Sequence, residues 1–183
     1  MTQSISSALP DAGQVYWSAR IEQALPAFSD LKIDLPPSRF VAQAFEQADF
    51  VIERLPSLAG GVVADIGCGA GKLAIGFHAR LVREYGGIDL RPRYVEFARH
   101  LFRDNPVYEF QVVDVYNERY SKDGQIEPQD YRLPWPDQSV DLVLCYSLFT
   151  HFDSFDDVHH YVCEIGRILK PGGAWLATWL TAP

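Results

Sequence analysis

Three glycines at every second position follow a short run of β-branched and small residues in the segment VVADIGCGAGK, residues 62–72. Glycine admits backbone conformations with positive φ and lets another group approach the main chain closely. A β-branched run that leads into a glycine-rich turn and then a helix is typical of a buried strand whose turn directs backbone N–H groups at a ligand. The segment therefore predicts a ligand-binding turn at the carboxyl end of a strand.

The rest of the chain alternates between strand and helix patterns. Apolar runs predict strands at 62–66, 85–89, 108–113, 140–146 and 174–180, and helical periodicity predicts helices at about 38–55, 71–83, 92–103 and 155–169. Ser38 is the expected start of the first helix and Pro56 its end, while Ser154 or Asp153 caps the last helix, which stops at the segment KPGG. Such alternation predicts an α/β fold, a doubly wound and mostly parallel sheet with helices on both faces.

Two segments depart from this alternation. Residues 1–37 mix Ser, Pro and Gly with scattered aromatic residues, which predicts an irregular arm or a lid of short helices in front of a domain at 38–183. Residues 116–139 are polar and rich in turn formers, so we expect a hairpin turn at Asp123-Gly124 and no helix.

Charge and cysteine content limit the partners and the compartment. The formal net charge of −8 and the pI near 5.0 disfavour binding to phosphate backbones and anionic lipid. The three cysteines form no CxxC pair, which favours a reduced compartment. The N-terminal segment has neither a basic start nor a long apolar block. We therefore expect a cytoplasmic protein with neither nucleic acid nor membrane as partner.

Carboxylates end three neighbouring strands. Asp65 ends the first, where burial without a partner is costly, so loop N–H groups or a ligand's ammonium and hydroxyl groups are the expected donors. Asp89 ends the second, where an acid accepts two ribose hydroxyls, and Asp114 ends the third, where it suits an exocyclic amine. The three acids predict a pocket for a cationic or donor-rich nucleoside. They also disfavour a nicotinamide oxidoreductase, as does the spacing G-x-G-x-G before Lys72.

With these residues the chain resembles the class I S-adenosylmethionine-dependent methyltransferases. VVADIGCGAGK resembles their first motif, GGIDL the ribose-binding acid, QVVDV the adenine-contacting acid, LPWPDQSVDLVLCYSLFTHF the fourth-strand region and EIGRILKPGGAWLAT the helix-turn-strand signature. The resemblance covers roughly residues 58–180. It implies a Rossmann-like fold, S-adenosyl-L-methionine as cofactor and S-adenosyl-L-homocysteine as product. Bacterial small-molecule and glycan methyltransferases are the most similar subgroup, which implies an acceptor of that kind.

The resemblance also implies roles for individual residues. Its cofactor-binding residues would be Asp65, Gly67, Cys68, Gly69, Gly71, Asp89, Leu90, Asp114, Val115, Tyr146 and Ser147. Asp65 would organise the loop whose glycines line the methionine part, Asp89 would bind the ribose, and Asp114 with Val115 would meet the adenine. Tyr146 and Ser147 would face the methyl group. The Cys68 side chain is expected to fill space rather than to react.

Three further side-chain groups leave alternatives open. His151, in the tripeptide FTH, is either a general base for a hydroxyl or amine acceptor or a support of the cofactor shell. The segment HFDSFDDVHH suggests a metal site, but helix capping explains its aspartates, so no metal is predicted. The arginines of the helix after Asp89 are expected to form a solvated face; they are Arg91, Arg93, Arg99 and Arg103.

The chain's last residues raise a separate expectation. The family's sheet normally has seven strands, yet only TAP follows AWLATWL here, so we expect five strands without the C-terminal hairpin and a truncated form. The fifth strand would be an open edge near Trp175 and Trp179, which a second copy in a homodimer or the N-terminal arm would cover. The rival to an active enzyme is a catalytically silent cofactor-binding module that regulates or scaffolds a partner.

Overall fold

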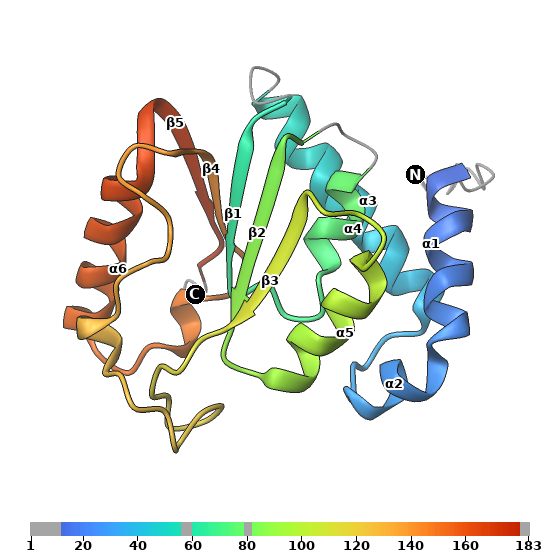
Figure 1. Cartoon of the computed structure of the whole chain (residues 1–183), viewed down its shortest axis with the longest axis horizontal. Helices are drawn as coiled ribbons and strands as arrows, with labels where there is room; N and C mark the ends of the chain where they lie inside the picture. Colours follow the sequence, from blue (N-terminus) through green and yellow to red (C-terminus); the bar gives the residue numbers. More distant parts are fainter. Residues whose placement is uncertain (1–11, 56–59, 79–81, 180–183) are drawn as a thin grey trace, which may run out of the picture.

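Five parallel strands form the centre of the computed structural model, which describes residues 12–55, 60–78 and 82–179 (Figure 1). The strands are β1 (Val62–Ile66), β2 (Glu84–Asp89), β3 (Tyr108–Val112), β4 (Val140–Cys145) and β5 (Leu169–Ala177). Their order in the sheet is β3-β2-β1-β4-β5, and each pair is parallel. The chain thus builds outward from β1 in one direction and then returns to its other side at β4. Ligands bind at the carboxyl ends of the strands beside such a reversal.

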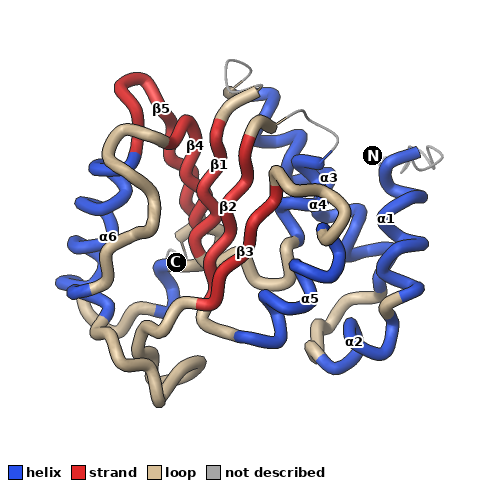
Figure 2. Tube along the Cα trace, in the orientation of Figure 1, coloured by secondary structure: helices blue, strands red, loops and turns tan. Residues whose placement is uncertain are grey.

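Helices cover both faces of the sheet, as the sequence predicts. One face carries α3 (Pro37–Arg54), α4 (Lys72–His78) and α5 (Pro92–Phe102), and the other carries α6 (Phe155–Ile168) (Figure 2). Their apolar stripes bury two clusters, one on each face of the sheet. The doubly wound, Rossmann-like fold class is confirmed.

The described N-terminal residues form two helices rather than an irregular arm. They are α1 (Ala12–Gln23) and α2 (Leu25–Asp30). Trp17, Ile21 and Phe28 are buried in the same cluster as α3 and α5, because their spacing places them on one side of each helix. The α1 helix lies at the opposite end of the molecule from β5 (Figure 1), so the described part of this segment does not cover that edge. Its role as a lid stays a prediction.

Several boundaries differ from the predicted ones. The first domain helix begins at Pro37 with Pro36 as N-cap, not at Ser38, because proline's fixed φ suits the first helical position. The end of α3 at Arg54, with Leu55 as C-cap, agrees with a helix that stops before Pro56. Pro56 itself, residues 79–81 of the second predicted helix and residue 180 of the fifth strand lie outside the described residues. Residues 82 and 83 are not helical, so α4 is shorter than expected.

Strand β5 begins at Leu169 instead of 174. Leu169 pairs with Val140, and the pairing with β4 then resumes at Ala174 opposite Leu142, so residues 170–173 form an irregularity in the strand without a Cα partner in β4. The turn predicted from the proline and glycines falls on this irregularity, and the continuous pairing starts at Ala174 as predicted. Within the described residues β5 pairs only with β4, so it is an edge strand as expected. Beyond it, the half-exposed Trp179 ring stacks on Phe149 with centroids 4.6 Å apart. The truncation and the homodimer stay predictions.

The segment between β3 and β4 folds back on itself as an irregular loop with one short 3-10 helix, η2 (Pro128–Asp130). Its hairpin bridge joins Asn117 to Ser121, so the hairpin is not centred on Asp123-Gly124 as predicted. That dipeptide belongs to the next turn, in which the Gly124 N–H donates to the Ser121 carbonyl at 3.2 Å. A second bridge, between Val115 and Ile126, holds the loop at the carboxyl edge of β3.

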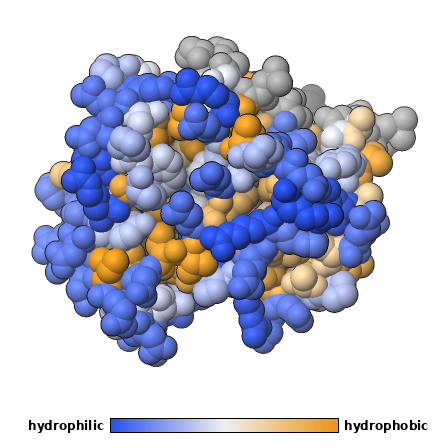
Figure 3. Space-filling model, in the orientation of Figure 1, coloured by the Kyte–Doolittle hydropathy of each residue, from blue (hydrophilic) through white to orange (hydrophobic). Residues whose placement is uncertain are grey.

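The surface seen in Figure 3 is mixed. Apolar residues gather in the middle of this face between polar surroundings. No helix in the described part of the chain is long and apolar enough to cross a membrane.

Candidate functional site

The glycine loop after β1 has a left-handed backbone at all three glycines. Gly67, Gly69 and Gly71 have φ values of +81°, +55° and +77°, a region that side chains with a Cβ rarely adopt. The N–H groups of Gly67 and Cys68 both donate to the Ile88 carbonyl, at 2.8 and 3.0 Å, which ties the loop to β2. The repeated glycines are thus required first by the path of the chain.

Gly71 differs from the other two glycines. A Cβ at Gly71 would lie 3.2 Å from the Ala98 Cβ on α5, so this position serves the packing of loop on helix. Gly67 and Gly69 line the cleft at the strand ends, whereas Gly71 lines neither of its cavities. The structure thus gives Gly71 a packing role, and the cofactor contact predicted for it stays a prediction that neither cavity supports.

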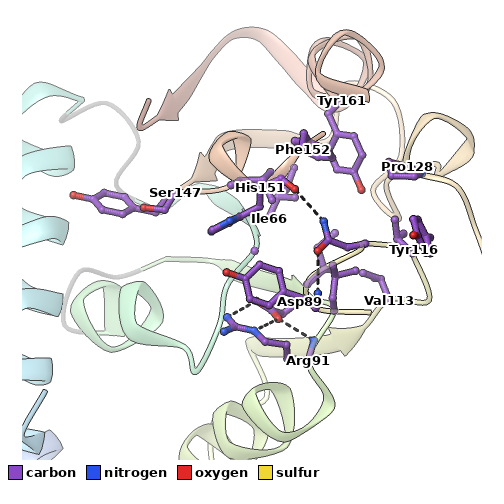
Figure 4. Close-up of a pocket in the computed structure, with 18 residues that line it drawn as sticks. Ile66, Asp89, Arg91, Val113, Tyr116, Pro128, Ser147, His151, Phe152 and Tyr161 are labelled. Atoms are coloured by element: carbon purple, nitrogen blue, oxygen red, sulfur yellow. Dashed lines mark hydrogen bonds and ion pairs between the residues drawn. The ribbon is translucent and has the colours of Figure 1, made fainter. Parts of the chain in front are cut away.

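Two adjoining cavities occupy the carboxyl ends of β1, β2 and β4. The first cavity (Figure 4) brings together seven predicted site residues, Gly67, Asp89, Leu90, Val115, Tyr146, Ser147 and His151. The second cavity holds Asp65, Cys68 and Gly69, and it shares Gly67, Tyr146 and Ser147 with the first. Residues far apart in the sequence therefore meet in one cleft, as strand-end positions in a parallel sheet should.

Asp89 lies at the junction of the glycine loop and α5, and its side chain is only 6% exposed. Its Oδ2 accepts the Gly69 N–H at 2.8 Å, and its Oδ1 accepts the Arg91 N–H at 2.9 Å. The Arg91 guanidinium adds Nε–H to Oδ1 at 3.1 Å and Nη2–H to Oδ2 at 3.4 Å. The carboxylate faces the first cavity, where a ribose would need it.

Asp65 is almost fully buried and has a different donor from the expected ones. The Tyr85 hydroxyl donates to Oδ2 at 2.6 Å, because β1 and β2 pair in a register that brings the two side chains together. The other oxygen, Oδ1, is buried without a hydrogen-bond partner. Burial raises the pKa of Asp65 to about 7, Tyr85 opposes that rise, and the charge of Asp89 adds to it. The predicted loop N–H donors are wrong, since the Tyr85 hydroxyl is the donor found, and Oδ1 is left without one in a residue that lines the second cavity.

The free energy of unfolding should depend on pH through the buried carboxyl group of Asp65. Because the pKa of Asp65 is raised in the folded state, that state binds more protons than the unfolded chain between about pH 4 and pH 7. The contribution of Asp65 to the unfolding free energy without cofactor should therefore decline as the pH rises through that window, by on the order of a few kcal/mol at most. In Asp65→Asn this decline should be smaller, as measured by urea unfolding at a series of pH values. Glu109→Gln, at an exposed carboxylate, should keep the wild-type decline, and a shared profile for all three proteins would contradict the expectation.

Asp114 is not placed as predicted. Its side chain is exposed, lines neither cavity, and accepts the Gln125 N–H at 3.2 Å because the loop folds back at this point. Its neighbour Val115 is buried and lines the first cavity. Of these two neighbours, Val115 therefore faces the cleft and the Asp114 carboxylate does not. The adenine contacts expected of both residues stay predictions, and the placement of Asp114 does not support its contact.

Cys68 packs inward. A Cβ on Gly87 would lie 2.9 Å from both the Cβ and the Sγ of Cys68, so the thiol fills space over β2. Burial raises the pKa of this thiol well above its ordinary range, which keeps it protonated and unreactive. The expectation of a space-filling Cys68 agrees with this packing.

The segment after β4 forms the wall opposite Asp89. Ser147 has φ of +58°, and its N–H donates to the Thr178 Oγ1 at 2.7 Å. His151 ends a short 3-10 helix, η3 (Phe149–His151), and its carbonyl accepts the Asn117 amide at 3.0 Å across the cleft. The Tyr120 ring meets the imidazole edge-on with centroids 5.0 Å apart. Burial lowers the pKa of His151, and the positive charges of Arg119 and Arg91 lower it further.

Sequence reasoning missed several residues of the cleft. Arg91 was assigned to a solvated face, but it lines both cavities and pairs with Asp89. Arg99 is also bound, donating to the Phe110 carbonyl at 2.7 Å. Ile33 and Leu35, before α3, wall the second cavity. The position of Arg91 two residues after a strand-end acid was a usable signal, whereas nothing local marked the N-terminal wall.

The acids of α6 lie in its first turn, where negative charge favours a helix. The Ser154 hydroxyl oxygen accepts the Asp156 N–H at 3.0 Å, so Ser154 is the N-cap, and Asp156 and Asp157 lie in the first turn. In the described part of the chain no group of three or more His, Cys, Asp or Glu is placed to hold a metal ion.

Comparison with known proteins identifies the class. Residues 64–177 match the family described as "Methyltransferase domain". The chain belongs to that family, the class I S-adenosylmethionine-dependent methyltransferases, and its cofactor is S-adenosyl-L-methionine.

Individual relatives agree with this assignment. The chain is 34% identical over 121 residues to the uncharacterized methyltransferase YcgJ of Bacillus subtilis, covering 66% of this chain and 41% of YcgJ. It is 32% identical over 126 residues to a ubiquinone biosynthesis O-methyltransferase of Xanthomonas oryzae pv. oryzae, covering 68% and 45%. The YcgJ crystal structure matches with a TM-score of 0.55 at 28% identity, over 72% of this chain and 49% of that one.

A third relative shows the fold alone. Geranyl diphosphate C-methyltransferase from Streptomyces coelicolor, solved with Mg²⁺, geranyl diphosphate and S-adenosyl-L-homocysteine, matches with a TM-score of 0.54 at 22% identity, over 72% of this chain and 44% of that one. The chain thus spans less than half the length of each of these proteins in the matches.

The cleft fits the cofactor of this class. The unpartnered Oδ1 of Asp65 suits an ammonium group, because a buried carboxylate oxygen without a donor is unfavourable. Gly67 and Gly69 line the second cavity without a side chain of their own. Asp89 presents a carboxylate at the first cavity. These three features match the ammonium, the linear chain and the ribose of one amino-acid nucleoside.

Proposed function

We propose that this chain transfers the methyl group of S-adenosyl-L-methionine to an oxygen, nitrogen or carbon atom of a small-molecule or glycan acceptor. The cofactor would span both cavities, with its ribose at Asp89, its adenine between Leu90 and Val115, and its methionine part along Gly67 and Gly69. Asp65 would accept the ammonium. Support comes from the lining of the two cavities, which share the residues at their junction.

The single observation that carries a catalytic role is the place of His151. It lines the same cavity as Asp89, Tyr146 and Ser147, and its lowered pKa keeps the imidazole neutral near neutral pH. A neutral imidazole can accept the proton that a hydroxyl or amine acceptor releases. The bound cofactor supplies an activated methyl group on a sulfonium. Tyr146 and Ser147 would hold the acceptor side and exclude water.

The first cavity also favours an apolar or aromatic acceptor. Tyr116, Tyr120, Phe152 and Tyr161 line it beyond the ribose-binding acid, and their rings suit a planar partner. The Xanthomonas relative is named for O-methyl transfer in ubiquinone biosynthesis, which supports an oxygen acceptor. We therefore propose that the methyl acceptor is a phenolic small molecule in preference to a glycan. From the sequence we retain the proposals of a cytoplasmic location and of no nucleic-acid partner.

The test is methyl transfer to a panel of phenols, sugars and small amines, with His151→Ala beside the wild type. If His151 is the base, its loss should lower turnover about 100-fold while the affinity for S-adenosyl-L-homocysteine changes little. Wild-type turnover should also decline at low pH, where the imidazole becomes protonated. His159→Ala, at an exposed histidine of α6, is the matched control and should keep full turnover.

Other outcomes point elsewhere. Equal losses of turnover and cofactor affinity in His151→Ala would make this residue part of the cofactor shell. Cofactor binding without transfer to any member of the panel would favour the silent regulatory or scaffold module instead.

A further inference from the structure

Asp89 has a full set of hydrogen-bond donors before any ribose arrives. An ionised carboxylate has about four acceptor positions on its two oxygens. The structure fills one with the Gly69 N–H. The other three take the Arg91 N–H and the Nε–H and Nη2–H of the Arg91 guanidinium (Figure 4). A ribose diol that binds this carboxylate brings two more donors, so two of the present donors must leave.

Only the guanidinium is free to leave. The Gly69 N–H belongs to the loop that is tied to β2, and the Arg91 N–H lies at the start of α5. The Arg91 side chain, by contrast, is 34% exposed. Its two hydrogen bonds to Asp89 are 3.1 and 3.4 Å long, and the second is near the limit for such a bond. Its departure would vacate one acceptor position on each oxygen, which is what two neighbouring hydroxyls require.

Two tyrosine rings beside Arg91 can hold its guanidinium after it leaves Asp89. Its guanidinium carbon lies 3.7 Å from the centroid of the Tyr94 ring and 5.3 Å from that of Tyr120. Arg91 and Tyr94 both line the second cavity, so a guanidinium that slides over the Tyr94 ring can leave Asp89 and keep its contact with an aromatic face.

We propose that Arg91 is a built-in competitor for the cofactor's ribose: its guanidinium occupies the Asp89 carboxylate in the free protein and must be displaced for the nucleoside to bind. This inference rests on the ribose role proposed above for Asp89. Arg91 therefore lowers cofactor affinity, although it lies in the cofactor site. A residue that contacted the cofactor favourably would have the opposite effect.

The test uses adenosine, which carries the ribose diol but neither the ammonium nor the carboxylate of methionine. Calorimetric titration compares the wild type with Arg91→Met, which keeps an apolar stem and lacks the donors. Adenosine should bind Arg91→Met about threefold to tenfold more tightly, the range expected when a partly exposed ion pair no longer has to be broken. The gain should be smaller for 2′-deoxyadenosine, which needs one acceptor position fewer.

Two controls separate this effect from a general change in charge or folding. Arg93→Met removes the same charge from an exposed position of α5 and should leave adenosine affinity unchanged. Salt screens the Arg91–Asp89 ion pair and not the uncharged ligand, so salt should tighten adenosine binding to the wild type and to Arg93→Met. It should have little effect on Arg91→Met. Arg91→Lys, which keeps the charge without the forked donors, gives a second variant and should show an intermediate gain.

The outcomes are distinct for the two proposals. Weaker or unchanged adenosine binding in Arg91→Met, or an equal gain in Arg93→Met, would overturn the competitor while leaving Asp89 as the ribose acid. If Asp89→Asn binds adenosine as well as the wild type does, the nucleoside lies elsewhere, and both the site and the competitor are overturned.

Discussion

Gly76→Ala should destabilise the protein by about 2–4 kcal/mol, although the substitution adds a single methyl group in a helix. Gly76 lies in α4 where this helix crosses α3, and a Cβ there would collide with the Ala44 carbonyl oxygen and the Ala48 side chain. Because the nearest clashing atom belongs to the α3 main chain, a rotamer change cannot remove the clash. The two helices would have to move apart, which would weaken their packing. Urea unfolding of the purified variant measures the change.

Gly166→Ala is the matched control, because it makes the same substitution in another helix. A Cβ at Gly166 in α6 meets nothing within 4 Å. Alanine loses less backbone entropy than glycine on folding, so this variant should be as stable as the wild type or more stable by up to about 1 kcal/mol. Equal unfolding free energies for the two variants would show that α3 and α4 do not meet as described.

Asp89→Ala should weaken S-adenosyl-L-homocysteine binding about 100-fold or more. Each charge-assisted hydrogen bond to the ribose contributes roughly 1.5–3 kcal/mol, and two would be lost. The Gly69 N–H would also lose its acceptor, which loosens the glycine loop. Calorimetry on the folded variant measures the affinity.

Asp114→Ala provides the comparison for this loss. The Asp114 carboxylate is exposed and accepts a loop N–H outside both cavities, so its removal should cost at most a few-fold in affinity. If the two variants lose affinity equally, the assignment of the ribose to the second strand-end acid is wrong.

The sequence was a good guide wherever structure depends on neighbours along the chain. Strand β1 has the predicted bounds, because a short β-branched run before a glycine turn has few other solutions. The last helix begins after Ser154 as expected, because capping is a local hydrogen bond. The pairing of Leu169 with Val140 was missed, because Pro171 and two glycines are typical of a turn and this pair lies before them; the continuous pairing with β4 begins at Ala174, where the strand is predicted.

The residues of the site also fall into those that local sequence predicted and those that depend on tertiary contacts. Asp65, Asp89 and the glycines at 67 and 69 could be assigned to one edge because the carboxyl ends of parallel strands must lie together. The Tyr85 hydroxyl on Asp65 could not be foreseen, because it depends on the register between β1 and β2. Arg91 was misread because periodicity marks which side of a helix is polar, and it does not tell which polar residue turns back to a neighbouring acid.

The sequence by itself determined the parallel α/β sheet and the edge at which its glycine loop and strand-end acids meet, because these follow from the order of strands, turns and helices along the chain. The class of cofactor came from the resemblance of its motifs to those of one family. Tertiary structure alone decided that Gly71 packs on α5, that the Asp114 carboxylate binds the Gln125 N–H, and that the segment before α3 walls the second cavity. The physical reason is that these contacts join residues on different elements. Their geometry is set by strand register, helix crossing and the folding back of one long loop, and none of these leaves a periodic signal in the sequence.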